Sequence, residues 1–189
     1  AARPGEVIWD ACAGGGGKTL AIADRVDGMA TFYASDIRAW KLDELKNRAK
    51  RTGISNLKTF PWDAGHAPNF PDAVVQKQGC HWVLVDAPCS ASGTWRRAPD
   101  AKFRVPPADL QELQDLQFKI LSKAAGAVRL GGHLVYATCS FFRAENEDVM
   151  ERVLASEFGR KFALREQKLS GCPDFDADTM FVGVLKRNS

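Results

Sequence analysis

Residues 10–19 read DACAGGGGKT, a glycine-rich turn that directly follows the short apolar segment EVIWD at residues 6–10. Beyond the turn, residues 18–26 carry apolar side chains at helical spacing. A strand, a glycine loop and a helix in this order form a unit that binds nucleotides and related ligands in α/β proteins. The segment therefore predicts an α/β fold and leaves open which adenosine-bearing ligand lies against the loop.

Apolar strand-like segments and helical segments alternate along the rest of the chain. Further strands are predicted at residues 30–36, 57–64, 81–89, 131–140, 162–169 and 180–187. Helices are predicted at residues 38–53, 107–129 and 143–158. This alternation predicts a single domain with a doubly wound, mostly parallel, seven-stranded sheet of the Rossmann-like type.

Composition narrows the class of protein. The 189 residues are 45% hydrophobic and 26% charged, which is typical of one globular domain, and no long apolar run predicts a membrane span. The five cysteines form no CxxC pair and the three histidines are scattered, so we expect no metal site and no disulfide framework. We expect reduced thiols, a cytoplasmic location and a monomer.

Acidic residues stand where four of the predicted strands end. They are Asp10, Asp36, Asp63 and Asp86, and a fifth strand ends in Thr138 followed by Cys139. In doubly wound sheets, ligands bind outside the carboxyl ends of the strands. We therefore expect the active site at this edge of the sheet.

The glycine loop can be compared with three known loop types, which bind a triphosphate, a dinucleotide or S-adenosylmethionine. A P-loop, GxxxxGK[ST], matches Gly17, Lys18 and Thr19 but requires glycine where Cys12 stands, although WVLVD at residues 82–86 is similar to a Walker B strand. A dinucleotide GxGxxG motif would require its third glycine at Thr19. An S-adenosylmethionine loop fits better, because Asp36 lies about 20 residues further on, where an acid binds ribose hydroxyls. A P-loop NTPase remains the alternative.

Two cysteines follow adjacent strands, Cys89 in DAPCS and Cys139 in ATCS. A lone cysteine near a strand end is usually a small buried hydrophobe. Two of them, each followed by serine, suggest nucleophilic catalysis. Carbon 5 of a pyrimidine is a poor nucleophile, and a thiolate that adds to carbon 6 activates it for methylation.

The chain resembles the Sun/Fmu family of RNA cytosine-5 methyltransferases. The matching motifs occur in the family's order over nearly the whole chain: PGEVIWDACAGGGGKT, SDIR, WDA, VDAPCSASGTWRRAPD and GGHLVYATCSFFRAENEDV. The paired DAPCS and TCS distinguish it from DNA cytosine methyltransferases and from amino-group methyltransferases. The resemblance implies S-adenosylmethionine as cofactor and RNA as substrate, with ribosomal RNA expected first and transfer RNA second.

The resemblance also implies residue roles. Cys139 is the nucleophile, Cys89 assists product release, Asp86 contacts the target cytosine and Lys18 reaches towards cofactor and base. Asp36 binds the ribose and Asp63 the adenine region. The implied cofactor-binding set is Cys12, Ala13, Gly14, Gly15, Gly16, Gly17, Lys18, Asp36, Arg38, Asp63, Asp86 and Pro88.

The chain departs from the family pattern at a few positions. Gly15 stands where proline is frequent, Ala91 replaces a usual glycine, and Thr179 and Met180 replace glycine and phenylalanine. Because little sequence precedes the first strand, we expect a fragment that lacks an N-terminal RNA-binding region.

A basic loop follows Cys89. The residues predicted to contact RNA phosphates are Arg96, Arg97, Lys102 and Arg104. Trp95 and Phe103 either stack on bases or pack the loop against the domain. The target base must be unpaired or flipped out to reach Cys139. A non-catalytic RNA-binding assembly factor that keeps the fold is a further alternative.

Overall fold

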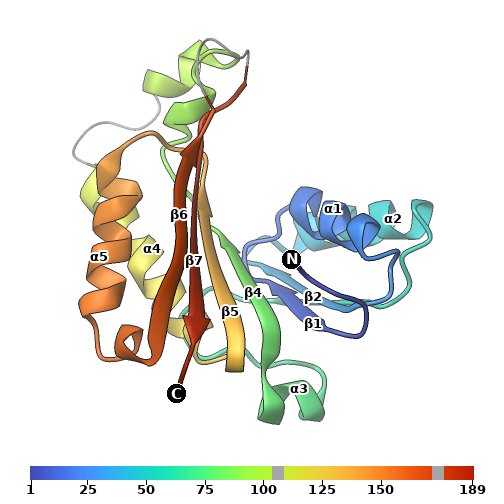
Figure 1. Ribbon diagram of the computed structural model, residues 1–189. Helices are drawn as coiled ribbons and strands as arrows, with labels where there is room; N and C mark the ends of the chain where they lie inside the picture. Colours follow the sequence, from blue (N-terminus) through green and yellow to red (C-terminus); the bar gives the residue numbers. More distant parts are fainter. Residues whose placement is uncertain (104–108, 172–176) are drawn as a thin grey trace.

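A twisted seven-stranded sheet forms the centre of the protein in a computed structural model that describes residues 1–103, 109–171 and 177–189 (Figure 1). The strand order is β3-β2-β1-β4-β5-β7-β6. The strands are β1 (Val7–Asp10), β2 (Thr31–Asp36), β3 (Leu57–Pro61), β4 (Cys80–Asp86), β5 (Val128–Thr138), β6 (Phe162–Ser170) and β7 (Met180–Arg187). This architecture confirms the predicted fold class.

Strands β1 to β5 run parallel, and only β7 is antiparallel to its neighbours β5 and β6. The chain starts in the middle of the sheet at β1, extends to β2 and β3, and then crosses to β4 on the other side. Asp10 thus lies in register with Ala34 of β2 and Leu84 of β4. The switch point between β1 and β4 is where such sheets leave room for a ligand.

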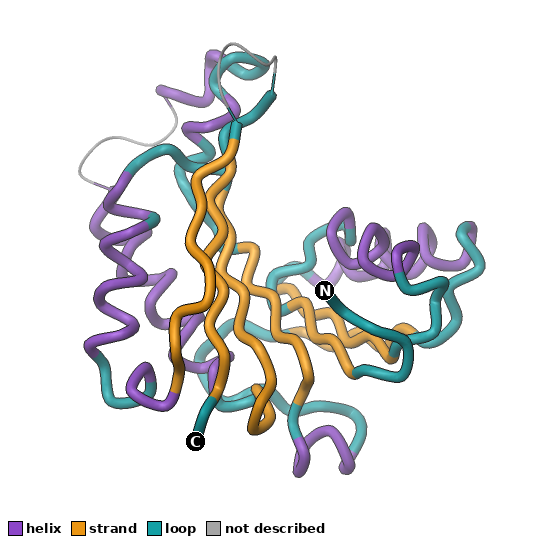
Figure 2. The backbone as a smooth tube through the Cα atoms, in the orientation of Figure 1, coloured by secondary structure: helices purple, strands orange, loops and turns teal. Residues whose placement is uncertain are grey.

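Helices cover both faces of the sheet (Figure 2). One side carries α1 (Gly17–Arg25) and α2 (Ala39–Arg51), and the other carries α4 (Asp109–Ala125) and α5 (Glu147–Ala155). Apolar side chains that alternate along β1 and β2 divide between the two layers: Ile8 and Phe32 pack with Ala23 of α1, whereas Trp9 and Tyr33 join the larger cluster on the α4 side. Both faces of β1 and β2 are therefore buried, as their apolar sequences predict.

Three elements show the main differences from the sequence prediction, and β3, β4 and α4 also end several residues earlier than predicted. The short helix α3 (Ala73–Gln78) was not predicted; Asp72 caps it by accepting a hydrogen bond from the Val74 backbone at 3.0 Å. The helix predicted at 143–158 is instead a 3₁₀ turn, η3 (Arg143–Glu145), followed by α5, because Asn146 has non-helical dihedrals. β5 begins at Val128, earlier than predicted, where it pairs with Cys80 of β4.

Two further 3₁₀ turns, η1 (Ser92–Thr94) and η2 (Pro99–Phe103), lie beyond the carboxyl end of β4, close to Thr179, which directly precedes β7 (Figure 1). The Thr179 backbone donates to the Gly93 carbonyl at 3.0 Å, which joins the two loops. A fourth turn, η4 (Gly159–Lys161), leads into β6. Within the described ranges, no helix is both long and apolar enough to span a membrane.

Candidate active site

The carboxyl ends of β1, β2, β4 and β5 bring the predicted polar residues to one edge of the sheet. Asp10, Asp36 and Asp86 are the last residues of their strands, and Cys139 follows the end of β5. Asp63 lies two residues beyond β3. The expected clustering of these side chains is therefore present.

The glycine loop folds back onto β2. The Ala13 backbone donates to the Ser35 carbonyl at 2.9 Å, and the Gly14 backbone donates to Oδ2 of Asp36 at 2.9 Å. Gly16 has a φ of +82°, and a Cβ atom there would lie 2.0 Å from Cδ1 of the buried Leu45. Glycine is thus required at position 16, because a side chain would collide with α2 while the backbone is left-handed.

Asp36 is the acid that the loop encloses. Its side chain is 5% exposed and accepts four hydrogen bonds. Two come from the backbone amides of Gly14 and Arg38, and two from the side-chain Nε and Nη2 nitrogens of Arg38. Burial opposes ionisation of the carboxyl, but the hydrogen bonds from Arg38 and Gly14 outweigh it and lower the pKa of Asp36. Asp36 is therefore a fixed carboxylate at the cavity wall.

A cavity of about 550 Å³ lies between the ends of β1, β2 and β4 and helix α4. The predicted cofactor residues in its wall are Cys12, Ala13, Gly14, Asp36, Arg38, Asp63, Asp86 and Pro88. Gly15, Gly16, Gly17 and Lys18 lie outside this wall, in the loop and the first turn of α1. Their part in cofactor binding stays a prediction.

Apolar residues that the sequence analysis did not assign to the site complete the wall. They are chiefly Ile37, Trp62, Leu116 and Ile120. Ile37, directly after Asp36, is 70% exposed. An exposed apolar side chain beside the cavity indicates a ligand contact, but its exposure cannot be read from the sequence. Leu116 and Ile120 lie one helical turn apart on α4. The same spacing is typical of a helix face that packs on the core, so the sequence does not indicate a ligand site there.

Asp10 is buried beneath the loop. Its Oδ2 accepts a hydrogen bond from Oγ1 of Thr19 at 2.6 Å, while its Oδ1 has no hydrogen-bond partner among the described residues. Burial, aided by the nearby charge of Asp86, raises the pKa of Asp10 to about 6 against the opposing hydrogen bond from Thr19. Asp63, by contrast, is exposed and accepts from the Gly65 backbone at 2.7 Å.

The sulfur atoms of Cys89 and Cys139 lie 3.4 Å apart. The hydrogen bond from Cys89 lowers the pKa of the Cys139 thiol to about 7, opposed by burial and by the charge of Asp86 and supported by Lys18. The same contact, together with burial, raises the pKa of Cys89. The pair therefore favours a thiolate on Cys139 and a thiol on Cys89.

Lys18 and Asp86 link the cysteines to the cavity. Nζ of Lys18 lies 2.7 Å from Oδ2 of Asp86, and both side chains are partly exposed. Asp86 lines the cavity, and its charge also acts on the Cys139 thiol. A group bound in the cavity next to Asp86 would thus lie near the Cys139 sulfur.

The turn after Cys89 has a backbone conformation that favours glycine at position 91, where this chain departs from the family pattern. Ala91 has a φ of +56°, a left-handed conformation in which glycine carries no strain. Gly93, two residues on, could not carry a side chain, because a Cβ atom would lie 2.2 Å from the Thr179 carbonyl oxygen. The turn that presents Cys89 is therefore tightly held against the β6–β7 connection.

The basic loop lies beside the cysteines, with mixed exposure of its side chains. The ring of Trp95 packs edge-on against Phe141 at 5.2 Å, whereas Phe103 is 79% exposed with Nζ of Lys102 at 4.9 Å from its ring. Nε of Arg97 pairs with Asp178 at 2.7 Å. Trp95 thus anchors the loop and Phe103 is available for stacking; Arg104 lies outside the described residues.

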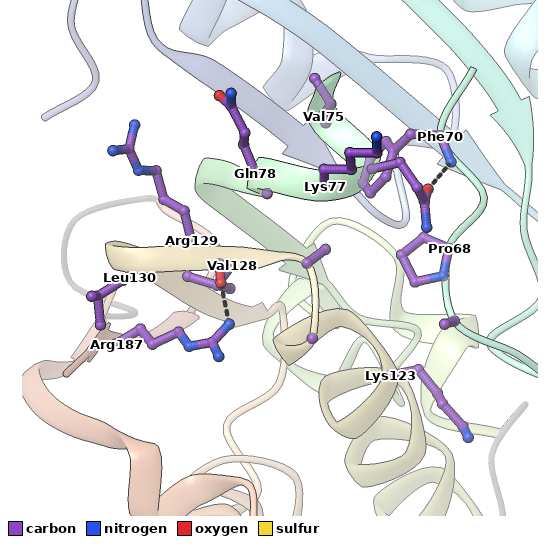
Figure 3. A pocket seen from close by; sticks show the side chains of 15 residues that line it. Pro68, Phe70, Val75, Lys77, Gln78, Lys123, Val128, Arg129, Leu130 and Arg187 are labelled. Carbon is purple, nitrogen blue, oxygen red and sulfur yellow. Dashed lines mark hydrogen bonds between the residues drawn. The ribbon is translucent and has the colours of Figure 1, made fainter. Parts of the chain in front are cut away.

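A second, basic cavity of about 340 Å³ lies at the opposite edge of the sheet, near the amino ends of β4 and β5 (Figure 3). Lys123 and Arg129 point away from one another, and Arg187 donates to the Val128 carbonyl. These cations do not converge on a common ligand position. In the described part of the chain, no cluster of His, Cys, Asp and Glu could hold a metal ion.

Solved structures similar to the chain share its overall fold. The structure of PH0851 superimposes on 98% of this chain and 43% of its own, with a TM-score of 0.87 and 30% identity. NSun6 from Pyrococcus horikoshii, solved with SFG, covers 100% of this chain and 49% of its own with a TM-score of 0.79 and 24% identity, which shows the fold alone. The fold is that of Rossmann-like S-adenosylmethionine-dependent methyltransferases.

Sequence comparison defines the family. The family model described as 16S rRNA methyltransferase RsmB/F matches residues 1–177, and the chain belongs to this family. Ribosomal RNA small subunit methyltransferase B of Pseudomonas syringae is 34% identical over 158 residues, 84% of this chain and 34% of the relative. A Synechocystis protein named "Probable ribosomal RNA small subunit methyltransferase B" is 37% identical over 152 residues, 80% of this chain and 33% of the relative.

These comparisons confirm the resemblance to the Sun/Fmu methyltransferases. The chain spans about a third of the length of the curated relatives that it matches. About two thirds of each relative's sequence thus has no counterpart in this chain.

Proposed function

We propose that the chain is the catalytic domain of an RNA cytosine-5 methyltransferase that acts on ribosomal RNA through a covalent cysteine–cytosine adduct. The observation that carries this proposal is the contact between Cys89 and Cys139, next to Asp86 at the cavity wall. The family, named for 16S rRNA methyltransferases, supports ribosomal RNA as the substrate class. Transfer RNA is the second candidate substrate.

The cavity suits S-adenosylmethionine in size and in the chemistry of its wall. A volume of about 550 Å³ lies in the range of small-molecule sites. Asp36 would accept hydrogen bonds from the ribose hydroxyls. These would replace the two hydrogen bonds that the Arg38 side chain now donates to Asp36. Ile37 and Trp62 offer apolar contacts for the adenine, near Asp63. The bound cofactor would supply an electrophilic methyl group.

Cys139 would act as the nucleophile. With its pKa lowered to about 7, a large fraction of its thiol is ionised near neutral pH, so the sulfur can add to carbon 6 of the cytosine. Carbon 5 then gains the electron density needed to accept the methyl group. Asp86, held by Lys18, would accept a hydrogen bond from the cytosine amino group and orient the ring.

Cys89 would assist product release. The pKa of Cys89 is raised first by its hydrogen bond to Cys139. Once the Cys139 sulfur is bonded to carbon, that sulfur no longer competes as an anion, and the Cys89 thiol can release its proton to solvent more readily. The Cys89 thiolate can then take the proton from carbon 5 while the bond between carbon 6 and Cys139 breaks.

The basic loop would hold the RNA strand next to the cysteines. Arg96, Arg97 and Lys102 lie on the η1–η2 segment that follows Cys89, and Arg104 continues it in sequence. Because Arg97 pairs with Asp178, a phosphate contact from Arg97 requires that ion pair to open. Phosphate contacts position the strand, and the target base must leave its stack to reach Cys139.

The test measures methyl transfer to RNA and adduct formation in matched cysteine variants. Cys139→Ala should abolish 5-methylcytosine formation while leaving S-adenosylmethionine binding near normal. Cys89→Ala should accumulate a covalent protein–RNA adduct that is stable on a denaturing gel. Cys80→Ala, at the amino end of β4, removes a buried thiol at the opposite end of that strand and should retain both activities.

Two further measurements, one with different RNA substrates and one with different cofactors, distinguish the alternative functions. Transcripts of ribosomal and transfer RNA are offered in parallel, and binding of labelled S-adenosylmethionine is compared with binding of ATP. Preferential ATP binding would favour a P-loop NTPase. Full cofactor and RNA binding without methyl transfer by the full-length protein would favour an assembly factor. Activity retained by Cys139→Ala would remove the proposed nucleophile.

A further inference from the structure

A buried carboxylate lies directly behind the two cysteines. Glu145, in η3, is fully buried. Its Oε1 accepts from the Ser90 backbone at 2.8 Å and from Nε2 of Gln117 at 3.0 Å. Its Oε2 accepts from Oγ of Ser90 at 2.5 Å and from Oγ of Ser140 at 2.6 Å. These four donors occupy the acceptor positions that an ionised carboxylate offers.

Two of the three residues that donate to the Glu145 carboxylate directly follow the cysteines in sequence. Ser90 directly follows Cys89, and Ser140 directly follows Cys139. Gln117 of α4 also donates to the Pro88 carbonyl at 3.0 Å, so the residues on both sides of Cys89 are held. One carboxylate therefore joins the two cysteine turns, whose serine hydroxyls lie 3.3 Å apart.

Strand β5 holds Glu145 in place from behind. The Tyr136 hydroxyl donates to the Glu145 carbonyl oxygen at 2.5 Å. Oγ1 of Thr138 donates to Oδ1 of Asn146 at 2.6 Å, and Nδ2 of Asn146 donates to the Ser140 carbonyl at 2.9 Å. Because η3 is tied to β5 at these points, Glu145 has a fixed position relative to Cys139.

The composition of this network argues for a role beyond packing. Among the described residues, no Lys or Arg bonds to the Glu145 carboxylate. A buried charge without a cation is costly, and apolar side chains of similar volume usually stabilise a core as well or better. The four hydrogen bonds offset that cost only while both cysteine turns keep their observed positions.

We propose that Glu145 is a positioning residue that clamps the turns of Cys89 and Cys139 so that their sulfur atoms stay in contact. The proposal rests on the proposed function for the meaning of that contact, although the clamp itself can be tested without methyl transfer. Loosening the clamp lengthens the distance between the sulfurs and weakens the hydrogen bond on which the Cys139 thiolate depends. The charged groups that act directly on Cys139 are Asp86 and Lys18. A substitution at Glu145 replaces neither of them.

The main variant is Glu145→Gln, which keeps the shape but turns one acceptor oxygen into a donor that faces other donors. The readout is the rate at which iodoacetamide alkylates Cys139 as a function of pH, followed by mass spectrometry of the peptide that contains Cys139. We expect the thiol pKa to rise and the rate at pH 7 to fall by about tenfold. Binding of S-adenosylmethionine should stay near normal, because Glu145 does not line the cavity.

Glu147→Gln is the matched control. Glu147 lies two residues further along, at the start of α5, outside the clamp, and its variant should keep the wild-type rate and pH profile. In a Cys89→Ala background, Glu145→Gln should add no further change, because the clamp acts on Cys139 through Cys89. A merely structural role would instead lower Tm without moving the pH profile.

Two results would overturn the clamp: a Glu145→Gln profile that matches the wild type, or an equal further shift in the Cys89→Ala background. Should Glu145→Gln fail to fold, Ser140→Ala removes one of the four donors, and we expect a smaller slowing in the same direction. An unchanged Ser140→Ala profile then counts against the proposal. Activity retained by Cys139→Ala removes the proposed function instead, so the two failures are distinguishable.

Discussion

The sulfur atoms of Cys89 and Cys139 lie 3.4 Å apart, although 50 residues separate them in the chain. Their strands, β4 and β5, are parallel neighbours with Asp86 in register with Ala137. The turns that leave these two strands therefore meet. The contact shifts the two thiol pKa values in opposite directions, lowering that of Cys139 and raising that of Cys89.

The first prediction concerns the pH dependence of Cys139. Its thiol pKa is lowered to about 7, so its alkylation rate should rise with pH and reach half of its maximum near pH 7. Below that pH the protonated, unreactive thiol predominates. Cys89→Ala removes the main cause of the shift and should move the midpoint up towards an ordinary thiol. A midpoint that stays near 7 in Cys89→Ala would contradict this assignment.

The second prediction concerns Asp36 and the cofactor. Asp36→Ala removes a carboxylate that accepts a hydrogen bond from Gly14 and would bind the ribose. A hydrogen bond to a charged group contributes about 1.5–3 kcal/mol, so S-adenosylmethionine affinity should fall by about tenfold or more. Isothermal titration calorimetry measures the change. Asp43→Ala, on the exposed face of α2 where Asp43 pairs with Lys46, is the control and should bind normally. Equal affinity for both variants would exclude Asp36 from the site.

The third prediction compares two adjacent glycines. Gly16→Ala places a Cβ atom 2.0 Å from Leu45 at a φ of +82° and should destabilise the protein by about 2–4 kcal/mol, combining overpacking with backbone strain. Gly17→Ala adds a Cβ atom with nothing within 4 Å at the first residue of α1, and should leave stability unchanged or slightly higher. Urea unfolding of both variants measures the difference. Similar stabilities would show that the loop tolerates a side chain at position 16.

The fourth prediction concerns Asp10 and stability. Because burial raises the pKa of Asp10 to about 6, the protonated carboxyl stabilises the folded state at low pH. That contribution is lost as the pH rises from about 4, the usual value for Asp, through about 6. Asp10→Asn cannot ionise, so its free energy of unfolding relative to the wild type should rise by about 2 kcal/mol across this window. A difference that stays constant with pH would show that Asp10 titrates normally.

Local sequence patterns predicted much of the fold because apolar periodicity directly reflects which strand and helix faces are buried. They did not predict α3, since six residues with one buried side chain carry too little periodicity. Ile37 and Leu116 were not assigned to the cavity for a related reason. An apolar side chain in a ligand site has the same identity and spacing as one in the core.

Contacts between distant segments position the basic loop. Trp95 packs on Phe141, which agrees with the packing interpretation, and a stacking role for Trp95 stays a prediction. The pairing of Arg97 with Asp178 joins residues 81 positions apart, on the η1–η2 segment and the β6–β7 connection. No local pattern indicates such a pair, because charge alone does not specify a partner.

The amino-acid sequence by itself determined the sheet, the glycine loop and the acids at the strand ends, because each depends on local periodicity, on glycine conformation or on the place where a strand stops. Only the tertiary structure placed the two sulfur atoms in contact, which sets the opposite directions of their thiol pKa values, and placed hydrogen-bond donors from both cysteine turns around the buried Glu145. Both features depend on distances between separate turns. Such distances depend on how whole strands are aligned across the sheet.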